Sequence, residues 1–139
     1  FIQIGQLMAV KEDVDDLVNK EDFKDKIIGA QTGTTGAIMA AEWQEEGFGT
    51  LRGYDTIDLA YMDLKNGQID GVLGDSTMAE SYAKSLGGIK AVGENYSSED
   101  IAFAVCKDNK EMVDKLNAGL KAVKESGKYD ELISQYFTN

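Results

Sequence analysis

The chain has 139 residues, 42% of them hydrophobic, so it can bury one ordinary core without disulfides or metals. Asp and Glu number 25 against 14 Lys and Arg, and a formal charge of -11 disfavours binding to nucleic acid or to anionic membrane surfaces. The absence of His removes the usual general base, the His-dependent nucleophile pairs and most transition-metal sites. The composition therefore excludes the many enzyme mechanisms that depend on His. We expect no metal or other cofactor.

The single cysteine, Cys106, follows the apolar run from Ile101 to Val105, which predicts a buried and inert thiol. No stretch approaches the roughly 20 apolar residues of a transmembrane helix. The residues from Phe1 to Gly5 show no basic segment, apolar core or cleavage site, and the first residue is not Met. We therefore expect a processed protein or an excised fragment that carries neither a signal peptide nor a lipid anchor.

Apolar, β-prone stretches alternate with stretches of helical periodicity, which is typical of a parallel sheet covered by helices. The sequence therefore predicts an α/β fold. In the first part of the chain, a short acidic helix is expected over Asp13 to Val18, and a helix containing Ile38 and Trp43 is expected to end at Gly47 to Gly49. The strands expected in this part are Gln6 to Val10, Lys26 to Gln31 and Thr50 to Tyr54.

The middle of the chain continues this alternation. Asp55 is placed to cap a helix that ends at Asn66 and Gly67. A strand over Gln68 to Gly74 follows, and the residues from Thr77 to Glu80 have the pattern of a capping box at the start of the next helix. The remaining strands are expected at Ile89 to Val92 and at Ile101 to Val105, the second one buried on both faces.

Two amphipathic helices are expected at the end of the chain. Asp108, with Glu111 three residues later, predicts the start of the first, and Gly127 separates it from the second. Their predicted buried faces are formed by Met112, Val113, Leu116, Leu120 and Val123, and by Tyr129, Leu132, Ile133, Tyr136 and Phe137.

The segment from Gln31 to Gly36 reads Gln-Thr-Gly-Thr-Thr-Gly and lies between a predicted strand and a predicted helix. Backbone N–H groups of such a loop can converge on an anion at the positive end of the helix. No Lys follows the glycines as in a P-loop, and the three-glycine spacing of a dinucleotide site is missing. The loop is a candidate carboxylate cradle; the simpler alternative is that Thr34 or Thr35 only caps the helix.

Asp75 directly follows the strand that ends at Gly74, and its simplest role is again to cap the next helix. With strand order 2-1-3, however, the strands ending at Gln31 and Gly74 flank the switch point at which open parallel sheets bind ligands. Neighbouring strands lie about 4.8 Å apart, so the loop and Asp75 would match the two charged groups of an amino acid. The ammonium would bind Asp75, and the carboxylate would bind the amides and hydroxyls of the loop.

Six segments form an ordered pattern along nearly all 139 residues: Ile4 to Gln6, Ile27 to Gly36, Tyr54-Asp55, Leu64 to Val72, Asp75, and Gly127 to Asp130. Together they resemble the extracytoplasmic amino-acid-binding proteins of ABC transporters, the family-3 solute-binding proteins. The Gly-Thr-Thr loop, the run Leu-Lys-Asn-Gly-Gln-Ile-Asp and the Asp that follows are its more specific parts.

This resemblance implies a periplasmic-binding-protein-like lobe, with a central mostly parallel sheet flanked by helices, hinge-crossing strands and two C-terminal helices. It implies an amino acid as ligand, an extracytoplasmic location, and an ABC transporter permease as partner of the intact protein. By position, it implies that Gly33, Thr34, Thr35 and Gly36 bind the ligand carboxylate, that Asp75 binds its α-amino group, and that Gln31 approaches its side chain.

Family members have a complete first lobe before the segment that corresponds to Phe1, and that lobe supplies an Arg and aromatic residues. The only Arg here, Arg52, does not match this position and is expected to be a solvated surface charge. The resemblance thus implies a hinge-crossing strand at 1–12, a second lobe at 13–100, and a return strand with C-terminal helices at 101–139. Because those helices would lack their usual cover, we expect them to form a homo-oligomer or to fold back onto the lobe, and we expect weak ligand binding.

Three other functions remain open. A dehydratase-like enzyme on the same fold would need an acid or base over the ligand, and Asp75 is the main carboxylate available. A phosphoacceptor like a response-regulator receiver would need acidic residues where Gly33 and Thr34 stand. The third alternative is an interaction module whose ligand site is vestigial.

Overall fold

The structure is a computed structural model that describes residues 1–136. The chain divides into two compact units. The first, here called the sheet unit, comprises Ile4–Glu99, and the second, here called the terminal unit, comprises Phe1–Gln3 with the chain from Asp100 onward.

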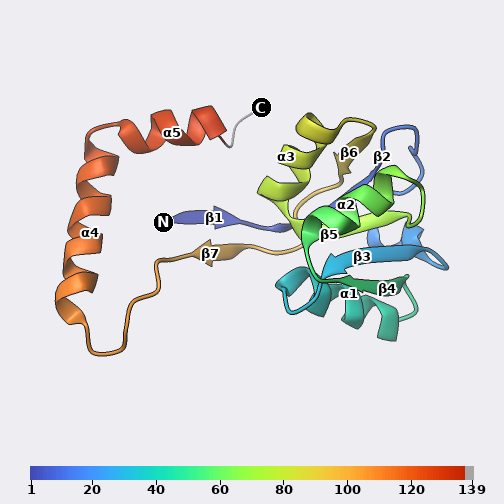
Figure 1. The fold of residues 1–139 in the computed structure, drawn as a ribbon, viewed down its shortest axis with the longest axis horizontal. Helices are drawn as coiled ribbons and strands as arrows, with labels where there is room; N and C mark the ends of the chain where they lie inside the picture. Colours follow the sequence, from blue (N-terminus) through green and yellow to red (C-terminus); the bar gives the residue numbers. More distant parts are fainter. Residues whose placement is uncertain (137–139) are drawn as a thin grey trace. The chain divides into compact units, whose positions relative to one another are not determined.

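The sheet unit is built on five strands (Figure 1). They are β2 (Gln6–Lys11), β3 (Ile27–Gln31), β4 (Thr50–Tyr54), β5 (Gly71–Asp75) and β6 (Ile89–Val92), in the order β4-β3-β5-β2-β6. β3 is parallel to β4 and β5, whereas β2 is antiparallel to β5 and β6, so only β2 is reversed. The predicted α/β fold and the predicted 2-1-3 order, formed by β4, β3 and β5, are both confirmed.

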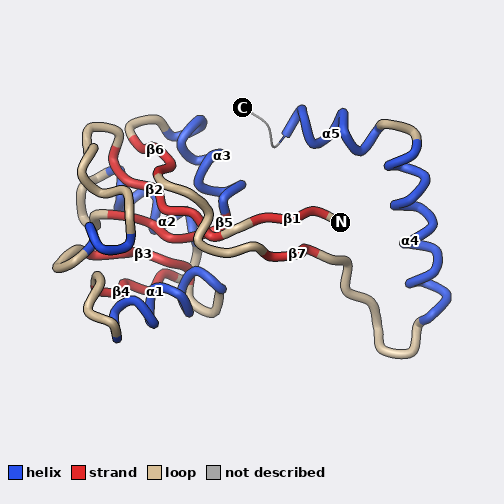
Figure 2. The backbone as a smooth tube through the Cα atoms, turned by 180° about the vertical axis from the view of Figure 1, so that it is seen from behind, coloured by secondary structure: helices blue, strands red, loops and turns tan. Residues whose placement is uncertain are grey.

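Helices cover both faces of this sheet because its central strands are apolar on both sides (Figure 2). In β2, Met8 packs on one face and Leu7 on the other, as the alternation of side chains along a strand requires. The face of Met8 is covered by α1 (Thr35–Glu45) through Trp43, and the face of Leu7 by α2 (Ile57–Lys65) and α3 (Ser76–Leu86). The predicted buried residues Ala60, Tyr61 and Leu64 of α2 are all buried.

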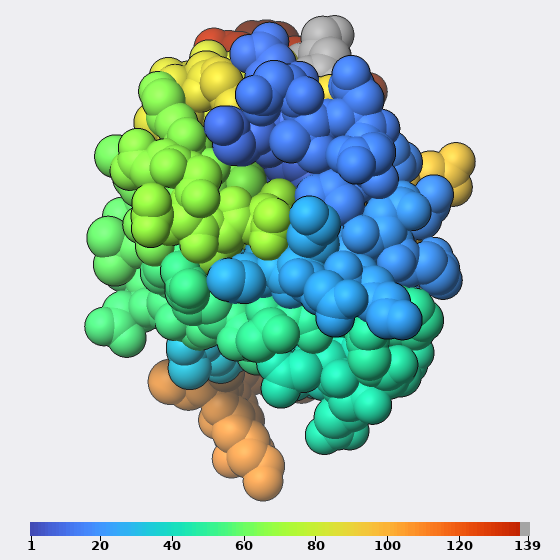
Figure 3. Space-filling view, turned by 90° about the vertical axis from the view of Figure 1, so that its right-hand side faces the viewer, coloured from blue at the N-terminus to red at the C-terminus, as the bar shows by residue number. Residues whose placement is uncertain are grey.

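One end of the sheet unit is seen in Figure 3, where segments drawn in blue, teal and light green pack into a continuous surface.

The predicted acidic helix over Asp13 to Val18 is wrong. Within this stretch Asp13 lies in a turn, Asp16 lies in a bend and the other residues have no regular structure; a short 3-10 helix, η1 (Lys20–Phe23), follows. Asp22 accepts hydrogen bonds from the backbone N–H groups of Val18 and Asn19, which favours a helix start at Lys20.

Three predicted helix caps are wrong, because several cap-forming residues stand side by side in the sequence. α2 is preceded by Thr56 as N-cap, not by Asp55. α3 begins at Ser76 with Asp75 at the N-cap position, so the predicted capping box from Thr77 is wrong. In α4 (Lys110–Glu125) the N-cap is Asn109, whose side chain accepts a hydrogen bond from the N–H of Met112.

The terminal unit contains two helices, α4 and α5 (Lys128–Tyr136), which match the two predicted C-terminal helices. A separate two-stranded sheet joins β1 (Ile2–Ile4) and β7 (Glu99–Ile101). The prediction of a strand buried on both faces from Ile101 to Val105 is wrong, since β7 ends at Ile101 and the following residues are mostly exposed. Cys106 is exposed as well, so its predicted burial is also wrong.

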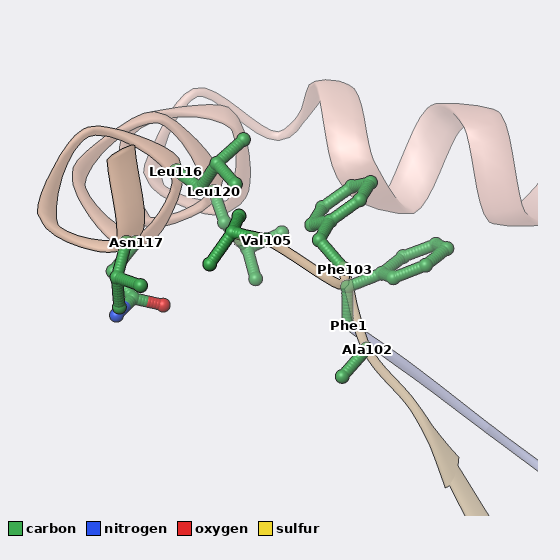
Figure 4. Close-up of a pocket in the computed structure, with 8 residues that line it drawn as sticks. Phe1, Ala102, Phe103, Val105, Leu116, Asn117 and Leu120 are labelled. Carbon is green, nitrogen blue, oxygen red and sulfur yellow. The ribbon is translucent and has the colours of Figure 1, made fainter. Parts of the chain in front are cut away.

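A small apolar pocket lies within the terminal unit (Figure 4). The rings of Phe1 and Phe103 stack with their centroids 4.8 Å apart on one side of it. The pocket has a volume of about 120 Å³ and is lined by Phe1, Ala102, Phe103, Val105, Val113, Leu116, Asn117 and Leu120.

The apolar faces of α4 and α5 are not buried in the described part of the chain. Leu116 and Leu120 are half-buried, but Met112, Val113, Val123, Leu132 and Tyr136 are exposed. Phe137, also assigned to this face in the sequence, lies outside the described residues. The helical periodicity therefore predicted the helices correctly, whereas the burial of their faces depends on a covering layer that the described residues do not provide.

Two features of the surface complete the fold. Arg52 is exposed, as predicted, and its Nη1 donates a hydrogen bond to the backbone oxygen of Gln68 at 3.1 Å. Among residues 1–136, helices that combine the length and the apolar character needed to cross a membrane are absent.

We expect the 139-residue chain to self-associate through the apolar faces of α4 and α5, because contiguous exposed apolar surface favours burial against a second copy. Sedimentation velocity should show an average mass that rises with protein concentration. Replacing Met112 and Val113 by Ser should lower this association, whereas Lys115→Gln on the same helix should not. A chain that remains monomeric at high concentration would contradict the prediction.

Candidate functional site

An open pocket of about 220 Å³ lies in the sheet unit where β3 and β5 end. It is lined by Gln6, Gln31, Thr34, Ile57, Gly74, Asp75 and Met78. The sheet order brings the ends of β3 and β5 together, because β5 is the neighbour of β3 on the side opposite β4. Three of the six residues predicted as ligand-binding, Gln31, Thr34 and Asp75, therefore line one pocket.

Thr34 acts as the cap of α1, as the simpler alternative proposed. Its Oγ1 accepts a hydrogen bond from the N–H of Ala37 at 3.3 Å and donates one to the backbone oxygen of Gln31 at 2.7 Å. The same residue also lines the pocket. Capping and exposure to the pocket are thus compatible at Thr34, and its role in ligand binding stays a prediction.

The other loop residues are placed differently. Thr35 is exposed, and its hydroxyl donates to Glu99 Oε2 at 3.1 Å. Gly33 is exposed in the left-handed backbone region, with a φ of 80°. Neither residue lines the pocket, although their loop connects β3 to the start of α1.

Gly36 allows the start of α1 to lie against the sheet. It is buried, and a Cβ atom added there would lie 2.7 Å from the backbone oxygen of Leu73 and 2.8 Å from Gln6 Oε1. The N–H groups of Thr35 and Gly36 are in the first turn, where a helix provides no acceptor of its own. The start of α1 next to the pocket thus carries the partial positive charge of a helix N-terminus.

Asp75 ends β5 and occupies the N-cap position of α3, but its side chain forms no capping hydrogen bond. Its Oδ1 instead accepts a hydrogen bond from Gln6 Nε2 at 2.8 Å. The carboxylate is half-buried at the pocket wall. The Asp75 side chain therefore does not cap α3, and the alternative that it serves only as a helix cap is wrong.

Sequence reasoning missed five residues of this site: Gln6, Ile57, Gly74 and Met78, which line the pocket, and Glu99, which contacts two site residues. Gln6 offered a signal, because a polar residue at the start of an otherwise apolar strand needs a buried partner. Glu99 offered none, since the segment before it has no regular pattern. Ile57 and Met78 were read only as part of their helices.

Glu99 adds a second carboxylate beside Asp75. Its Oε1 accepts hydrogen bonds from Ser97 Oγ at 2.8 Å and from Gln6 Nε2 at 3.1 Å. The Ser97 hydroxyl is the main reason that the pKa of Glu99 lies below its ordinary value, and the Gln6 and Thr35 side chains act in the same direction against the opposing effect of burial. The carboxylate is therefore held in its charged form.

Residues 2–139 match the family of bacterial extracellular solute-binding proteins, family 3. The chain belongs to this family. It is 35% identical over 121 residues to the ABC transporter arginine-binding protein 1 of Escherichia coli (strain K12), in an alignment covering 84% of this chain and 49% of that protein. Its identity to the arginine-binding periplasmic protein of Mannheimia haemolytica is 32%, over 81% of this chain and 49% of that protein. The chain thus spans about half the length of the curated relatives it matches.

Solved structures of amino-acid-binding proteins have the same fold. An ancestral arginine-binding protein bound to arginine superposes with a TM-score of 0.87 at 32% identity, covering 98% of this family-3 chain and 61% of that one. An ancestral amino acid-binding protein described as a precursor of cyclohexadienyl dehydratase gives a TM-score of 0.86 at 27% identity, covering 98% and 59% of the two chains. The predicted resemblance to family-3 solute-binding proteins is therefore confirmed.

We expect Glu99→Gln to lower the free energy of unfolding in a pH-dependent way. The pKa of Glu99 is depressed in the folded chain, so its contribution is present above the unfolded pKa and disappears as the pH falls through the folded pKa. The difference from the wild type should be largest near about pH 7 and shrink toward about pH 3. Urea unfolding across this range measures it, and a difference independent of pH would contradict the assignment.

We expect Gly36→Ala to destabilise the chain by about 1–3 kcal/mol, because the new Cβ would be too close to the backbone of β5 and to Gln6. Gly119→Ala is the matched control: Gly119 is exposed in α4, has open space around its position, and should gain about 0.5–1 kcal/mol from higher helix propensity. Thermal unfolding of the two variants should shift in opposite directions. Equal shifts would show that Gly36 is not constrained by its neighbours.

Proposed function

We propose that this chain binds the α-ammonium and α-carboxylate of an amino acid, as the substrate-capture component of an ABC importer. The observation that carries the proposal is the position of Asp75, whose side chain lies at the pocket wall and does not cap α3. A carboxylate in that position can accept charge-assisted hydrogen bonds from an ammonium group. In this proposal Asp75 binds the α-ammonium.

In this proposal the ligand carboxylate binds at the start of α1, next to the same pocket. Thr34 lines the pocket there, and the first-turn N–H groups of Thr35 and Gly36 provide donors at the positive end of the helix. Gly33 allows the tight turn that precedes them. The Thr35 hydroxyl donates to Glu99, so it can join carboxylate binding only by exchanging that acceptor for the ligand.

The size of the pocket is consistent with one wall of a larger site. Its volume of about 220 Å³ lies below the roughly 300–1,000 Å³ typical of ligand pockets, and it is open. Gln31 also lines the pocket and is half-buried, and in this proposal it contacts the ligand side chain. Because few groups surround the ligand, we expect this chain on its own to bind weakly.

L-arginine is the first ligand to test, because arginine is named as the ligand of several relatives, including those of Escherichia coli and Mannheimia haemolytica. The negative charges of Asp75 and Glu99 near the pocket also favour a cationic ligand.

We also propose an extracytoplasmic location and an ABC transporter permease as partner of the intact protein. The name of the Mannheimia haemolytica relative gives a periplasmic location for that protein.

A dehydratase is the competing function, because one similar structure is described as a precursor of cyclohexadienyl dehydratase. That protein is itself described as an amino acid-binding protein. Glu99 adds a possible acid or base, but both of its oxygens already accept hydrogen bonds from Ser97, Gln6 or Thr35. We therefore propose binding without catalysis; product formation from prephenate or arogenate would overturn this choice.

We expect calorimetric titration with the twenty common amino acids to detect weak binding, strongest for a cationic amino acid. The same titration of a chimera that adds the part of arginine-binding protein 1 of Escherichia coli that this chain does not span should show tighter binding. Absence of binding in both proteins would contradict amino-acid capture.

Asp75→Asn should weaken binding at least tenfold, since a hydrogen bond to a charged group contributes about 1.5–3 kcal/mol. Asp58→Asn is the control, because Asp58 is exposed in α2 and lies outside the pocket lining. Equal affinities of the Asp75→Asn variant and the wild type would support a vestigial site.

A further inference from the structure

Gln6 connects the two carboxylates next to the pocket. It is 1% exposed at the start of β2, and the register of β2 with β5 places it directly opposite Asp75. Its Nε2 donates to Asp75 Oδ1 at 2.8 Å and to Glu99 Oε1 at 3.1 Å. Each of the two amide hydrogens thus has a negatively charged acceptor.

The orientation of this amide is set by its surroundings. If oxygen and nitrogen were exchanged, Oε1 would face two carboxylates and repel both. In the observed orientation Oε1 is buried against the start of α1, close to Gly36, and is without a hydrogen-bond partner among the described residues. The two charge-assisted hydrogen bonds offset the cost of this buried acceptor.

This arrangement brings two negative charges close to each other at the edge of a pocket. Like charges at this separation repel, and the amide donors of Gln6 reduce that repulsion. The Asp75 carboxylate is consequently fixed in a direction set by a buried side chain, while it remains on the pocket wall. A rigid carboxylate loses less conformational entropy when it binds a cation.

We propose that Gln6 is a positioning residue that holds Asp75 and Glu99 as one paired-carboxylate site for a cationic group of the ligand. This rests on the proposed function, in which Asp75 binds the α-ammonium, and it adds that the affinity of Asp75 depends on Gln6. Glu99 contributes through its negative charge and through the second amide hydrogen of Gln6.

A double-mutant cycle with L-arginine as the probe tests this dependence. Gln6→Met keeps the size of the side chain and removes both hydrogen bonds. It should weaken L-arginine binding about tenfold in the wild type and less than twofold in an Asp75→Asn background, because a positioning residue has no further effect once its target has lost its charge. Equal factors in both backgrounds would overturn the proposal, since a merely structural role predicts additive losses.

Gln68→Met provides the matched control, because Gln68 is exposed and lies outside the pocket lining. It should leave L-arginine affinity unchanged. If Gln6→Met does not fold, Gln6→Glu takes its place in the cycle, because it keeps the shape of the side chain and replaces the amide donors by a third carboxylate.

A second measurement needs no ligand and separates this inference from the proposed function. In the wild-type chain, NMR should show the side-chain amide protons of Gln6 exchanging with solvent at least tenfold more slowly than those of Gln68, and shifting in Asp75→Asn. Slow exchange in a chain that binds no amino acid would contradict the proposed function but keep the positioning role. Exchange as fast as that of Gln68 would overturn the positioning role.

Discussion

The antiparallel pairing of β2 with β5 is the interaction on which the site depends. Its register sets Gln6 opposite Asp75, Leu7 opposite Gly74 and Met8 opposite Leu73. A slip of one residue would turn Gln6 toward the other face and bring Leu7 opposite Asp75. Met8 and Leu7 pack into different cores, one on each face of the sheet, so such a slip would require both cores to repack. Core packing and site geometry are therefore determined by the same contacts.

Much of the fold could be predicted from the sequence because it depends on local periodicity. The strands at Thr50 to Tyr54 and at Ile89 to Val92 have the predicted bounds, and the 2-1-3 order placed Gln31 and Asp75 at one pocket. Local periodicity reports which side of an element is apolar. It does not report what covers that side, which is why the burial expected after Ile101 and at Cys106 was wrong.

The candidate site was predicted in part for a related reason. Thr34 and Asp75 stand at element ends, where sequence patterns are informative, and both line the pocket. Gln6 and Glu99 reach the site through pairing between segments far apart in the chain, and the bond between them spans 93 positions. The choice between neighbouring cap residues, such as Asp108 and Asn109, also depends on backbone angles: Asp108 has a φ of 71°, which leaves Asn109 to cap α4.

The division of the chain also has a consequence for the order of folding. The sheet unit is continuous in sequence, whereas the terminal unit combines the first residues with those from Asp100 onward. Within the terminal unit, Gln3 Nε2 donates to Asp100 Oδ1 at 3.3 Å, so two points 97 positions apart must meet. A ribosome releases Gln3 long before Asp100, and closing so long a disordered loop is entropically unfavourable. In the folded sheet unit the two ends lie close together, since the N–H of Gln6 donates to Ser97 Oγ at 3.0 Å. The pairing of Gln3 with Asp100 therefore loses less chain entropy after the sheet unit has folded than before it.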